Sequence, residues 1–356
     1  MKVLSIGTDR SLFNSTSTMR GRILEYGKLF DELRVIVLTV KNLGLKPEKI
    51  SENVWIYPTN SSSRLFYLFD AWRIGRSWRG KFNVITAQDP FETGLVAWLL
   101  KLSTGVKFQL QIHTDFLSPN FKKTWLNFWR VRLAKFLLPR ADGIRTVSQK
   151  IINSIKRAKI RLKTEPVILP IWVDVEALRQ APITFNLWHK YRQFKKIILM
   201  VSRLESEKQI DLAIKNLADF LRGTKNVGLI IVGSGSEEQK LNNLVKELNL
   251  DDLVRFEGWQ EKENLVAYYK TANLFLTTSR YEGYGLAIVE ATACGLPVVA
   301  TDVGVALEIG AIIIEDFANL GSLIKKLFDS PVKIEIRKEW PTKNEYLTAY
   351  RQSLEI

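Results

Sequence analysis

The stretch that decides the fold is residues 279–304, SRYEGYGLAIVEATACGLPVVATDVG. The apolar run 272–278 before it predicts a β-strand, and the small and apolar residues of 286–294 recur at helical spacing. Gly295-Leu296-Pro297 then predicts the end of the helix, and residues 298–301 predict a second strand. We therefore expect strand, glycine turn, helix, glycine stop and strand, which is the repeating unit of a parallel α/β sheet.

Two glutamates accompany the Gly-Tyr-Gly turn in this stretch. Glu282 is expected in the loop at the carboxyl end of the first strand, and Glu290 about one turn inside the helix. Backbone N–H groups near Gly285 and Leu286 favour anions, whereas carboxylates accept hydrogen bonds from hydroxyls. A ligand with a phosphate at one end and a polyol at the other suits both features. An isolated pair at this spacing also fits an ordinary βαβ unit with two solvated glutamates.

A second charged loop lies upstream, after the predicted strand 197–202. It contains Arg203 and Lys208, and a guanidinium beside an ammonium at a strand end suits phosphate binding. Gly233-Ser234-Gly235 follows the next predicted strand, 228–232. This turn lacks the third glycine of a dinucleotide fingerprint, so it gives little support to a dehydrogenase.

Taken together, these motifs resemble the retaining nucleotide-sugar glycosyltransferases of family four, also called glycosyl transferases group 1. The resemblance implies an α/β chain with the GT-B fold, in which two Rossmann-like domains face each other across a cleft. We expect an acceptor-binding domain over residues 1–175 and a nucleotide-sugar-binding domain over 176–332. Residues 333–356 are expected to form a C-terminal helix that returns to the first domain.

The resemblance also assigns roles by position. Glu282 contacts the donor sugar, and Glu290 holds the ribose of the nucleotide. Arg203, Lys208 and the backbone amides of Gly285-Leu286 bind the diphosphate, where they would stabilise the charge that grows on the leaving group. No covalent nucleophile is evident, so the resemblance implies a same-face displacement assisted by the leaving phosphate.

Two further loops resemble the family with less detail. The segment that contains Trp259 and Gln260 matches the loop against which the nucleotide base lies, mainly through main-chain contacts. Thr301-Asp302-Val303-Gly304 resembles the loop that closes over the phosphates. Val305 replaces the second glycine usual there, which weakens the expectation of phosphate contacts from this loop.

The first half of the chain also alternates predicted strands and helices. Its first loop carries Asn14 to Thr18, all polar, where the family has glycines. The predicted strand 107–112 ends at His113 and Asp115. Ligands of open α/β sheets bind at such strand ends, and the family has a histidine in a similar position near the sugar and acceptor. A lone histidine is more often structural, and Asp115 can equally cap a helix or a turn.

Length and composition exclude several classes of protein. A chain of 356 residues with 46% hydrophobic and 25% charged residues fits two globular domains. No apolar run reaches the ~18 residues of a spanning helix, and Met1 opens directly into a predicted strand, so we expect a cytoplasmic protein. One cysteine and two histidines exclude an internal disulfide and a zinc cluster. No Asp-x-Asp motif is present, so neither a metal nor a tightly bound cofactor is expected.

The positive charge is confined to one half of the chain. Residues 1–175 hold 29 Lys and Arg against 13 Asp and Glu, a net charge of +16, whereas residues 176–356 have a net charge of −1. Within the basic half, aromatic and basic residues recur at helical spacing over 121–140. This segment predicts either a helix that rests on an anionic membrane or an amphipathic helix whose aromatic residues enter the core.

The sequence thus predicts a retaining glycosyltransferase that uses a nucleotide diphosphate sugar and a glycan or lipid-linked acceptor. We expect the protein in the cytoplasm, at the inner face of the cell membrane if the basic half binds lipid. Its expected role is in cell-surface polysaccharide or glycolipid synthesis. The alternatives are a nucleotide-sugar epimerase or a phosphorylase on the same fold, although no cofactor-bearing lysine of a phosphorylase is evident. The pI near 9.7 also suggests a nucleic-acid-binding protein, but no nucleic-acid motif accompanies the charge.

Overall fold

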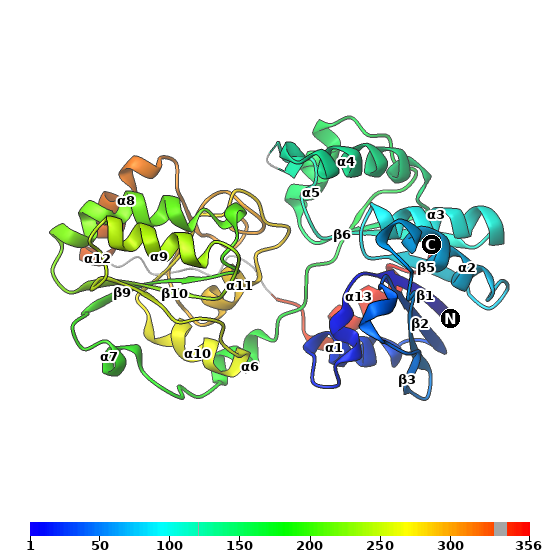
Figure 1. Cartoon of the computed structure of the whole chain (residues 1–356), viewed down its shortest axis with the longest axis horizontal. Coiled ribbons are helices and arrows are strands. Elements are labelled where there is room, and N and C mark those ends of the chain that lie inside the picture. Colours follow the sequence, from blue (N-terminus) through cyan, green and yellow to red (C-terminus); the bar gives the residue numbers. More distant parts are fainter. Residues whose placement is uncertain (120, 331–339) are drawn as a thin grey trace. The chain divides into compact units, whose positions relative to one another are not determined.

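The computed structural model describes residues 1–119, 121–330 and 340–356. These residues form two compact units (Figure 1). The first unit contains residues 1–170 and 342–356, and the second contains residues 171–341. The first boundary therefore lies five residues before the predicted one at 175, and the predicted boundary at 332 lies outside the described residues.

The first unit is built on a largely parallel sheet with the strand order β3-β4-β2-β1-β5-β6-β7-β8. Every neighbouring pair is parallel except β3 and β4. The strands are β1 (Lys2–Gly7), β2 (Glu32–Val37), β3 (Glu48–Ser51), β4 (Val54–Pro58), β5 (Val84–Ala87), β6 (Lys107–Ile112), β7 (Gly143–Thr146) and β8 (Val167–Ile168).

Helices from the strand connections and from the end of the chain pack on this sheet. They are α1 (Thr18–Gly27), α2 (Tyr67–Arg76), α3 (Glu92–Thr104), α4 (Trp125–Leu137), α5 (Gln149–Arg157) and α13 (Lys343–Gln352). From β1 the chain moves to β2, towards one edge of the sheet, and from β4 it returns through β5 and β6 to β7, towards the other edge. Because such crossovers are right-handed, α1 lies on one face of the sheet and α2, α3 and α4 lie on the opposite face. Consistent with this, α3 packs against both α2 and α4.

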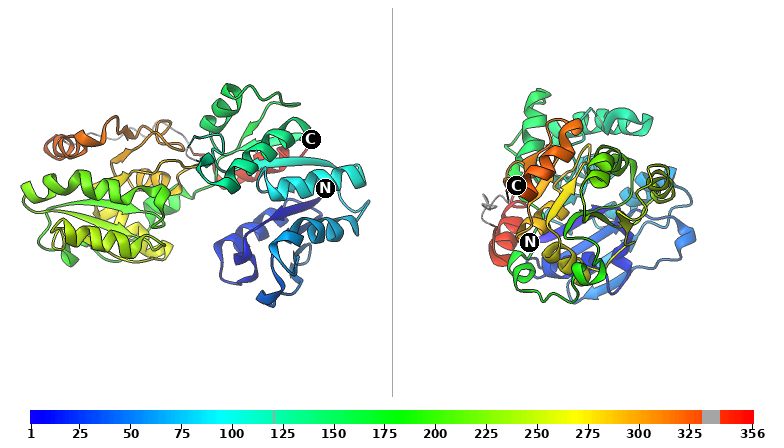
Figure 2. Two further views of the ribbon diagram at one scale, coloured as in Figure 1. Left: turned by 45° about the horizontal axis from the view of Figure 1, so that its top comes forward. Right: turned by 90° about the vertical axis from the view of Figure 1, so that its left-hand side faces the viewer.

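The last helix, α13, packs against α1 in the first unit, as the fold class implies. The rings of Tyr26 on α1 and Tyr350 on α13 stack with their centroids 4.1 Å apart. The hydroxyl oxygens of Tyr26 and Tyr346 lie 2.9 Å apart. The helix begins with a capping box formed by Thr342 and Glu345. Both chain ends therefore belong to the same unit (Figure 2).

The second unit contains a parallel sheet with the order β11-β10-β9-β12-β13-β14. Its strands are β9 (Lys196–Val201), β10 (Val227–Val232), β11 (Val254–Phe256), β12 (Leu274–Thr277), β13 (Val298–Ala300) and β14 (Ile312–Ile313). Its helices are α6 (Val175–Gln180), α7 (Leu187–Lys190), α8 (Ile210–Gly223), α9 (Glu238–Glu247), α10 (Lys262–Thr271), α11 (Leu286–Ala293) and α12 (Leu320–Asp329).

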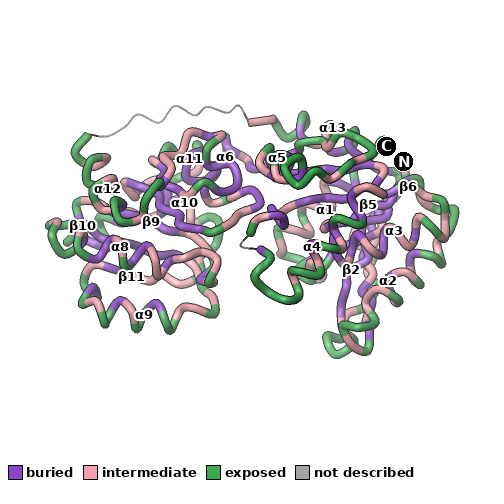
Figure 3. The backbone as a smooth tube through the Cα atoms, turned by 90° about the horizontal axis from the view of Figure 1, so that it is seen from above, coloured by how far each residue is buried: buried purple, intermediate pink, exposed green. Residues whose placement is uncertain are grey.

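Both faces of the second sheet are covered. Helices α8, α9 and α12 pack together, and α10 packs against α11 and α7; Figure 1 shows α8 and α10 on opposite sides of β10. Because helices shield both faces, every residue of β10 is buried, as in β5 of the first unit (Figure 3). This explains the continuous apolar runs in the sequence. The predicted strand, turn, helix and strand of 272–301 is confirmed as β12, α11 and β13.

The structure tests one of the two interpretations of the aromatic segment 121–140, that its aromatic residues enter the core. Helix α4 buries Val131, Ala134 and Leu137 but leaves most of its large aromatic side chains in solvent. Trp125 is 77% exposed, and Phe128, Trp129 and Phe136 are also exposed, whereas Phe121 just before the helix is buried. The interpretation that these aromatic residues enter the core is therefore wrong for α4 itself. None of the helices in the described ranges has the length and apolar character needed to cross a bilayer.

Candidate active site

The carboxyl ends of the strands in the second unit are joined into one continuous edge. Leu204, after β9, donates its N–H to Ser234 after β10 at 2.9 Å, and Gly233 donates to Gly258 after β11 at 2.8 Å. On the other side, the Thr278 hydroxyl after β12 donates to the carbonyl of Lys208 at 2.9 Å. These bonds hold the loops of four neighbouring strands in fixed positions at the edge where parallel α/β sheets bind ligands.

The Gly233-Ser234-Gly235 turn owes its glycines to this close packing. A Cβ on Gly233 would lie 1.9 Å from the carbonyl oxygen of Ser202, and a Cβ on Gly235 would lie 2.4 Å from that of Leu204. Gly233 also has a φ of +134°, which L side chains rarely adopt. The Gly-x-Gly pattern therefore reflects the approach of two loops in this fold, and no dinucleotide fingerprint is needed to explain it.

Lys208 and Glu282 form an ion pair at this edge. Lys208 ends the short 3₁₀ helix Ser206–Lys208, and its Nζ lies 2.5 Å from Oε1 of Glu282. The hydroxyl of Ser279 donates to the same carboxylate oxygen at 2.9 Å. Both charged side chains are largely shielded from solvent, with 12% of Lys208 and 21% of Glu282 exposed. The structure thus brings a predicted cation and a predicted carboxylate into contact, although they are 74 residues apart.

The turn between Glu282 and α11 is fixed by two glycines. Gly285 has a φ of +89° and is the residue before α11, so the first N–H groups of the helix point out beside the turn. Gly304, with a φ of +51°, packs under the turn, where a Cβ would lie 2.2 Å from the carbonyl oxygen of Tyr284. Val305 donates its N–H to that oxygen at 3.0 Å. Residues 301–305 therefore support the turn from below, which gives them a structural role regardless of any phosphate contact.

Glu290 lies one turn inside α11, where it is half-buried. Its Oε2 accepts a hydrogen bond from the hydroxyl of Tyr269 on α10 at 3.0 Å. Burial raises the pKa of Glu290, although the Tyr269 bond and the charge of Lys262 oppose the shift. Burial also raises the pKa of Tyr269 well above its ordinary value, with a smaller contribution from Glu290. The tyrosine is therefore a neutral donor that holds the carboxylate in place.

Arg203 is not part of the Lys208–Glu282 contact. Its side chain is 72% exposed and forms an ion pair with Glu207 at 3.1 Å. The backbone of the same glutamate accepts the N–H of Arg280 at 2.8 Å. Glu207 thus links Arg203 to the loop after β12, a role that the sequence did not reveal. Of the two predicted cations, Lys208 lies inside the site and Arg203 at its rim.

The predicted base-side loop is held by a buried glutamate. Glu257, after β11, accepts hydrogen bonds from the hydroxyls of Tyr191 and Tyr268 and from the ammonium of Lys190. The side-chain amide of Gln260 donates to the Glu257 carbonyl at 2.9 Å, so this amide stabilises its own loop. Trp259 is exposed and leaves its ring face available. Burial, aided by the contact with Glu257, raises the pKa of Tyr268 above its ordinary value.

His113 lies in the first unit, directly after β6. Its Nε2 lies 3.1 Å from Oε1 of Gln111, and that oxygen also accepts a bond from Arg145 at 3.2 Å. The side-chain nitrogen of Gln111 donates to Thr86 at 2.9 Å, which fixes the orientation of the amide. Nε2 of His113 must therefore carry the proton, and Nδ1 keeps its lone pair. Burial, and then the charges of Arg145 and Arg22, lower the pKa of His113 to about 3.

Arg145 connects this histidine to the last helix. It is buried on β7 and donates to the carbonyl of Leu169 at 3.3 Å and to the hydroxyl of Tyr346 on α13 at 3.0 Å. Asp115, also buried, accepts a bond from Ser154 at 2.9 Å through Oδ2, and its Oδ1 has no partner among the described residues. Sequence patterns gave no indication of Gln111 or Arg145, because both belong to strands that otherwise appear to be ordinary core.

No group of three or more His, Cys, Asp and Glu side chains in the described parts of the chain could hold a metal ion. The single cysteine, Cys294, is half-buried at the end of α11. Burial raises the pKa of its thiol to about 11. It therefore stays protonated at neutral pH and is a weak nucleophile.

Two family models match most of the chain between them. Residues 189–314 match the model described as "Glycosyl transferases group 1", and residues 28–177 match "Glycosyltransferase Family 4". The first contains Arg203, Lys208, Glu282 and Glu290, and the second contains His113.

Curated relatives align over part of their length. The GtfA subunit of the UDP-N-acetylglucosamine–peptide N-acetylglucosaminyltransferase of Streptococcus agalactiae is 27% identical over 218 residues, which are 59% of this chain and 40% of the relative. The alpha-monoglucosyldiacylglycerol synthase of Streptococcus pneumoniae is 25% identical over 231 residues, which are 62% of this chain and 52% of the relative. The chain thus spans about half the length of these relatives.

Solved structures match over the whole chain and show the GT-B fold. The sucrose-phosphate synthase of Thermosynechococcus elongatus superimposes with a TM-score of 0.77 at 18% identity, covering 100% of this chain and 94% of the other. The Anabaena protein HepE in complex with UDP-glucose gives a TM-score of 0.72 at 19% identity and covers 99% and 95%. At these identities the likeness establishes the fold and leaves the substrates open.

Proposed function

The chain belongs to the group 1 glycosyltransferases, and from this membership we propose that it transfers a sugar from a nucleotide diphosphate donor to a glycan or lipid-linked acceptor with retention of anomeric configuration. The observation that carries the proposal is the contact between Lys208 and Glu282 beside the start of α11. It combines a cation, a carboxylate and free helix N–H groups in one site, which is the set of groups that a sugar diphosphate needs.

Each group has a distinct task in the proposed reaction. Lys208 and the first N–H groups of α11 oppose the negative charge that develops on the leaving diphosphate, and Arg203 adds a cation at the rim. Glu282, already anchored by Ser279, orients the donor sugar through its hydroxyls. Glu290 holds the ribose, with its position fixed by Tyr269. This division of tasks requires no metal ion and no tightly bound cofactor, and Trp259 offers an aromatic face for the base.

His113 and Asp115 are proposed to act on the sugar and the acceptor. Because Nε2 of His113 is committed to Gln111, Nδ1 is the free acceptor and can receive a hydrogen bond from a hydroxyl. The low pKa keeps the ring neutral throughout the physiological range, so His113 positions a substrate without adding a charge. The unpaired Oδ1 of Asp115 is suited to accept from a further hydroxyl.

The charge distribution supports an acceptor at an anionic membrane surface. The first 175 residues carry the net charge of +16, and α4 in this part exposes four aromatic rings, those of Trp125, Phe128, Trp129 and Phe136. Exposed basic residues accompany them, and Arg132 lies over the rings of Phe128 and Trp129 at 4.4 and 5.4 Å. Aromatic and basic side chains on one helix are typical of peripheral membrane attachment. We therefore place the reaction on the cytoplasmic face of the cell membrane, in polysaccharide or glycolipid synthesis.

A donor screen tests the proposed function. Because a ligand that binds only the folded protein raises its melting temperature, thermal shift with a panel of UDP-, GDP- and ADP-sugars should identify the donor. UDP-N-acetylglucosamine and UDP-glucose are the first choices, since relatives or neighbours are named for them or bound to them. The donor that shifts the melting temperature should also release its nucleoside diphosphate slowly in the absence of acceptor.

Two outcomes would contradict the proposal. If no nucleotide sugar changes the melting temperature and none is hydrolysed, the assignment of the second unit as a donor-binding domain fails. If the sugar is released as its epimer, the chain is a nucleotide-sugar epimerase on the same fold. NMR of the released sugar separates transferase from epimerase, and the anomeric configuration of a transferred sugar tests retention.

A further inference from the structure

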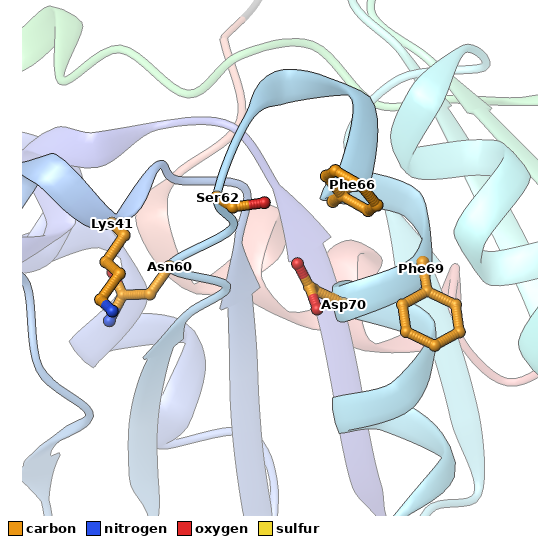
Figure 4. A pocket seen from close by; sticks show the side chains of 6 residues that line it. All are labelled: Lys41, Asn60, Ser62, Phe66, Phe69 and Asp70. Carbon is orange, nitrogen blue, oxygen red and sulfur yellow. The ribbon is translucent and has the colours of Figure 1, made fainter.

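The first unit contains a pocket of about 600 Å³ that none of the proposed roles explains. It is lined by Lys41, Asn60, Ser62, Phe66, Phe69 and Asp70 (Figure 4). Lys41 follows β2 and Asn60 follows β4, so the pocket lies at the carboxyl ends of two parallel strands. This is the edge at which open α/β sheets bind ligands.

Side-chain and backbone bonds make one wall of the pocket rigid. The loops after β2 and β4 are joined by Thr39 and Thr59, since Thr59 Oγ1 accepts from the Thr39 N–H at 2.8 Å and donates to its carbonyl at 2.9 Å. Asn60 has a φ of +48°, a left-handed conformation that its side chain supports by donating to the carbonyl of Leu45 at 2.8 Å. Lys41 donates its N–H to Ser61 at 2.9 Å. The polar wall is therefore fixed before any ligand arrives.

The opposite wall comes from the start of α2 and is aromatic. Phe66 is 52% exposed and Phe69 is 57% exposed, although both are large apolar side chains. In Figure 4 both rings lie on the α2 side of the pocket, and the Asp70 carboxylate points from α2 toward the wall with Lys41 and Asn60. Two exposed rings beside a carboxylate are an unfavourable surface for a lone protein but a suitable one for a ligand with both apolar and polar groups.

Asp70 is the polar anchor of this wall. Only 15% of its side chain is exposed, and its ion pair with Arg73 is long at 3.5 Å. Arg73 itself is largely in solvent, so this ion pair contributes little and leaves the carboxylate free to accept other hydrogen bonds. A carboxylate can accept from two neighbouring hydroxyls at once, while Lys41 and Ser62 can donate to others.

These groups match one class of ligand better than others. A pyranose ring has apolar C–H faces that pack on aromatic rings and hydroxyl edges that need acceptors and donors. An acyl chain would shield Asp70 from water and leave it only the long contact with Arg73, which is costly, and a phosphate would be repelled by the carboxylate. The combination of two phenylalanines, a carboxylate, a serine and a lysine therefore favours a sugar.

We propose that this pocket binds a pyranose residue of the acceptor glycan. The identification of that glycan as the acceptor rests on the proposed transferase function, whereas the sugar-binding property of the pocket does not. The first unit would then hold the acceptor by a sugar that is not the one receiving the transfer, using residues outside the His113 and Asp115 loop.

The test uses the full chain without nucleotide. Ligand-observed NMR with tetrasaccharides of glucose, galactose, mannose and N-acetylglucosamine at millimolar concentration should show saturation transfer from the protein to at least one series. The double variant Phe66→Ala/Phe69→Ala should weaken binding of that series at least tenfold, and Asp70→Asn should weaken it several-fold. Leu65→Ala is the matched control, because Leu65 is 89% exposed beside Phe66 and does not line the pocket. It should bind like the wild type.

The outcomes separate this proposal from the proposed function. If the wild type binds none of the series, or if the double variant binds as well as the wild type, the pocket proposal is overturned. Donor hydrolysis measured on the same variants should be unchanged, and in the complete reaction the acceptor KM should rise without a change in kcat. The wild type could bind no nucleotide sugar but bind a glycan that the Phe66→Ala/Phe69→Ala variant no longer binds. That result would support the pocket proposal and refute the transferase proposal.

Discussion

The ammonium nitrogen of Lys208 lies 2.5 Å from Oε1 of Glu282, and this contact joins the loop after β9 to the loop after β12. Because the two charges neutralise each other, fewer other polar groups are needed to offset the cost of removing them from water. A sugar diphosphate can interact with both at once, its phosphates with Lys208 and its hydroxyls with Glu282. The ion pair therefore holds the two groups that are proposed to bind opposite ends of the donor at a fixed distance from each other.

Substitution of the two glutamates of the candidate site should impair different steps of the reaction. Glu282→Ala should slow transfer while nucleoside diphosphate binding is retained, because the carboxylate is proposed to contact the reacting sugar. Glu290→Ala should weaken nucleotide binding, because it is proposed to hold the ribose. Each lost hydrogen bond to a charged group should cost roughly 1.5–3 kcal/mol, or about one to two orders of magnitude. Calorimetric titration and steady-state rates measure the two effects, and wild-type behaviour in both variants would refute the assignment.

The two cations should differ in importance. Lys208→Ala should lower turnover more than Arg203→Ala, because Lys208 is shielded and Arg203 is exposed, and charges act more strongly where water is excluded. Since side-chain cations are proposed to oppose the diphosphate charge, dialysis against a chelator should leave turnover unchanged. Loss of activity in chelator that a divalent ion restores would contradict this mechanism, and equal losses in both variants would contradict the ranking.

The strands and helices around the candidate site could be predicted because they follow local rules. Strand β6 was predicted with its observed bounds, and α11 to within one residue, since apolar periodicity and glycine stops are local features. Tyr269 could not be predicted as the partner of Glu290, because the two residues are 21 apart and meet only when α10 packs on α11.

The same reasoning explains the other residues that were missed. Arg145 and Tyr346 are 201 residues apart, and their bond depends on the return of α13 to the first unit. Glu257 appears in sequence as one of many charged loop residues, and only the fold brings two tyrosines and a lysine to it. Sequence periodicity also does not predict which side chains are exposed. The aromatic residues of α4 have the spacing of a core helix but remain in solvent.

Glu290 should reduce the stability of the folded protein. Its pKa is raised by burial, so the folded protein releases the proton at a higher pH than the unfolded chain does. Stability is consequently lost as the pH rises from the unfolded pKa through the folded one, and the loss is complete once the pH exceeds the folded pKa. Glu290→Gln keeps an acceptor for Tyr269 and removes the charge, so it should raise the melting temperature at pH 7 while weakening nucleotide binding. A lower melting temperature than the wild type at pH 7 would show that the charged form is stabilised.

His113 should make the protein sensitive to mild acid. Its pKa is about 3 in the folded protein and about 6.5 in an unfolded chain. Between these values the unfolded chain binds a proton that the folded protein excludes, so stability falls as the pH drops from about 6.5 toward 3. His113→Gln should flatten the dependence of the unfolding free energy on pH between 6.5 and 4.5. His189→Gln is the matched control, because His189 is the other histidine of the sequence and is exposed in the second unit. If the unfolding free energy depended on pH with the same slope in the wild type and both variants, His113 would not be neutral and buried in the folded protein.

The exposed face of α4 should bind anionic vesicles. Lys122, Lys123, Arg132 and Lys135 are exposed on or beside this helix, whereas the charge of Arg130 is engaged by Glu92 at 2.8 Å. Each Lys or Arg near an anionic surface contributes about 1 kcal/mol, so replacement of the four exposed residues by Gln should abolish co-sedimentation with phosphatidylglycerol vesicles at low salt. Salt should release the wild-type protein because it screens the surface charge. Replacement of Trp125 and Trp129 by Ser should also weaken binding, since their rings are proposed to enter the interface.

Two matched variants separate specific attachment from a general effect of charge. Four lysines of the second unit, Lys225, Lys246, Lys325 and Lys326, are exposed and can be changed to Gln with the same loss of charge. Trp188, which is exposed in the second unit, is the control for the tryptophans. If α4 is the attachment face, both controls should co-sediment like the wild type, and all variants should retain donor binding. Equal loss in the lysine control would mean that net charge alone drives the association. Recovery of the wild type in the supernatant with both anionic and neutral vesicles would refute membrane attachment and favour a soluble acceptor.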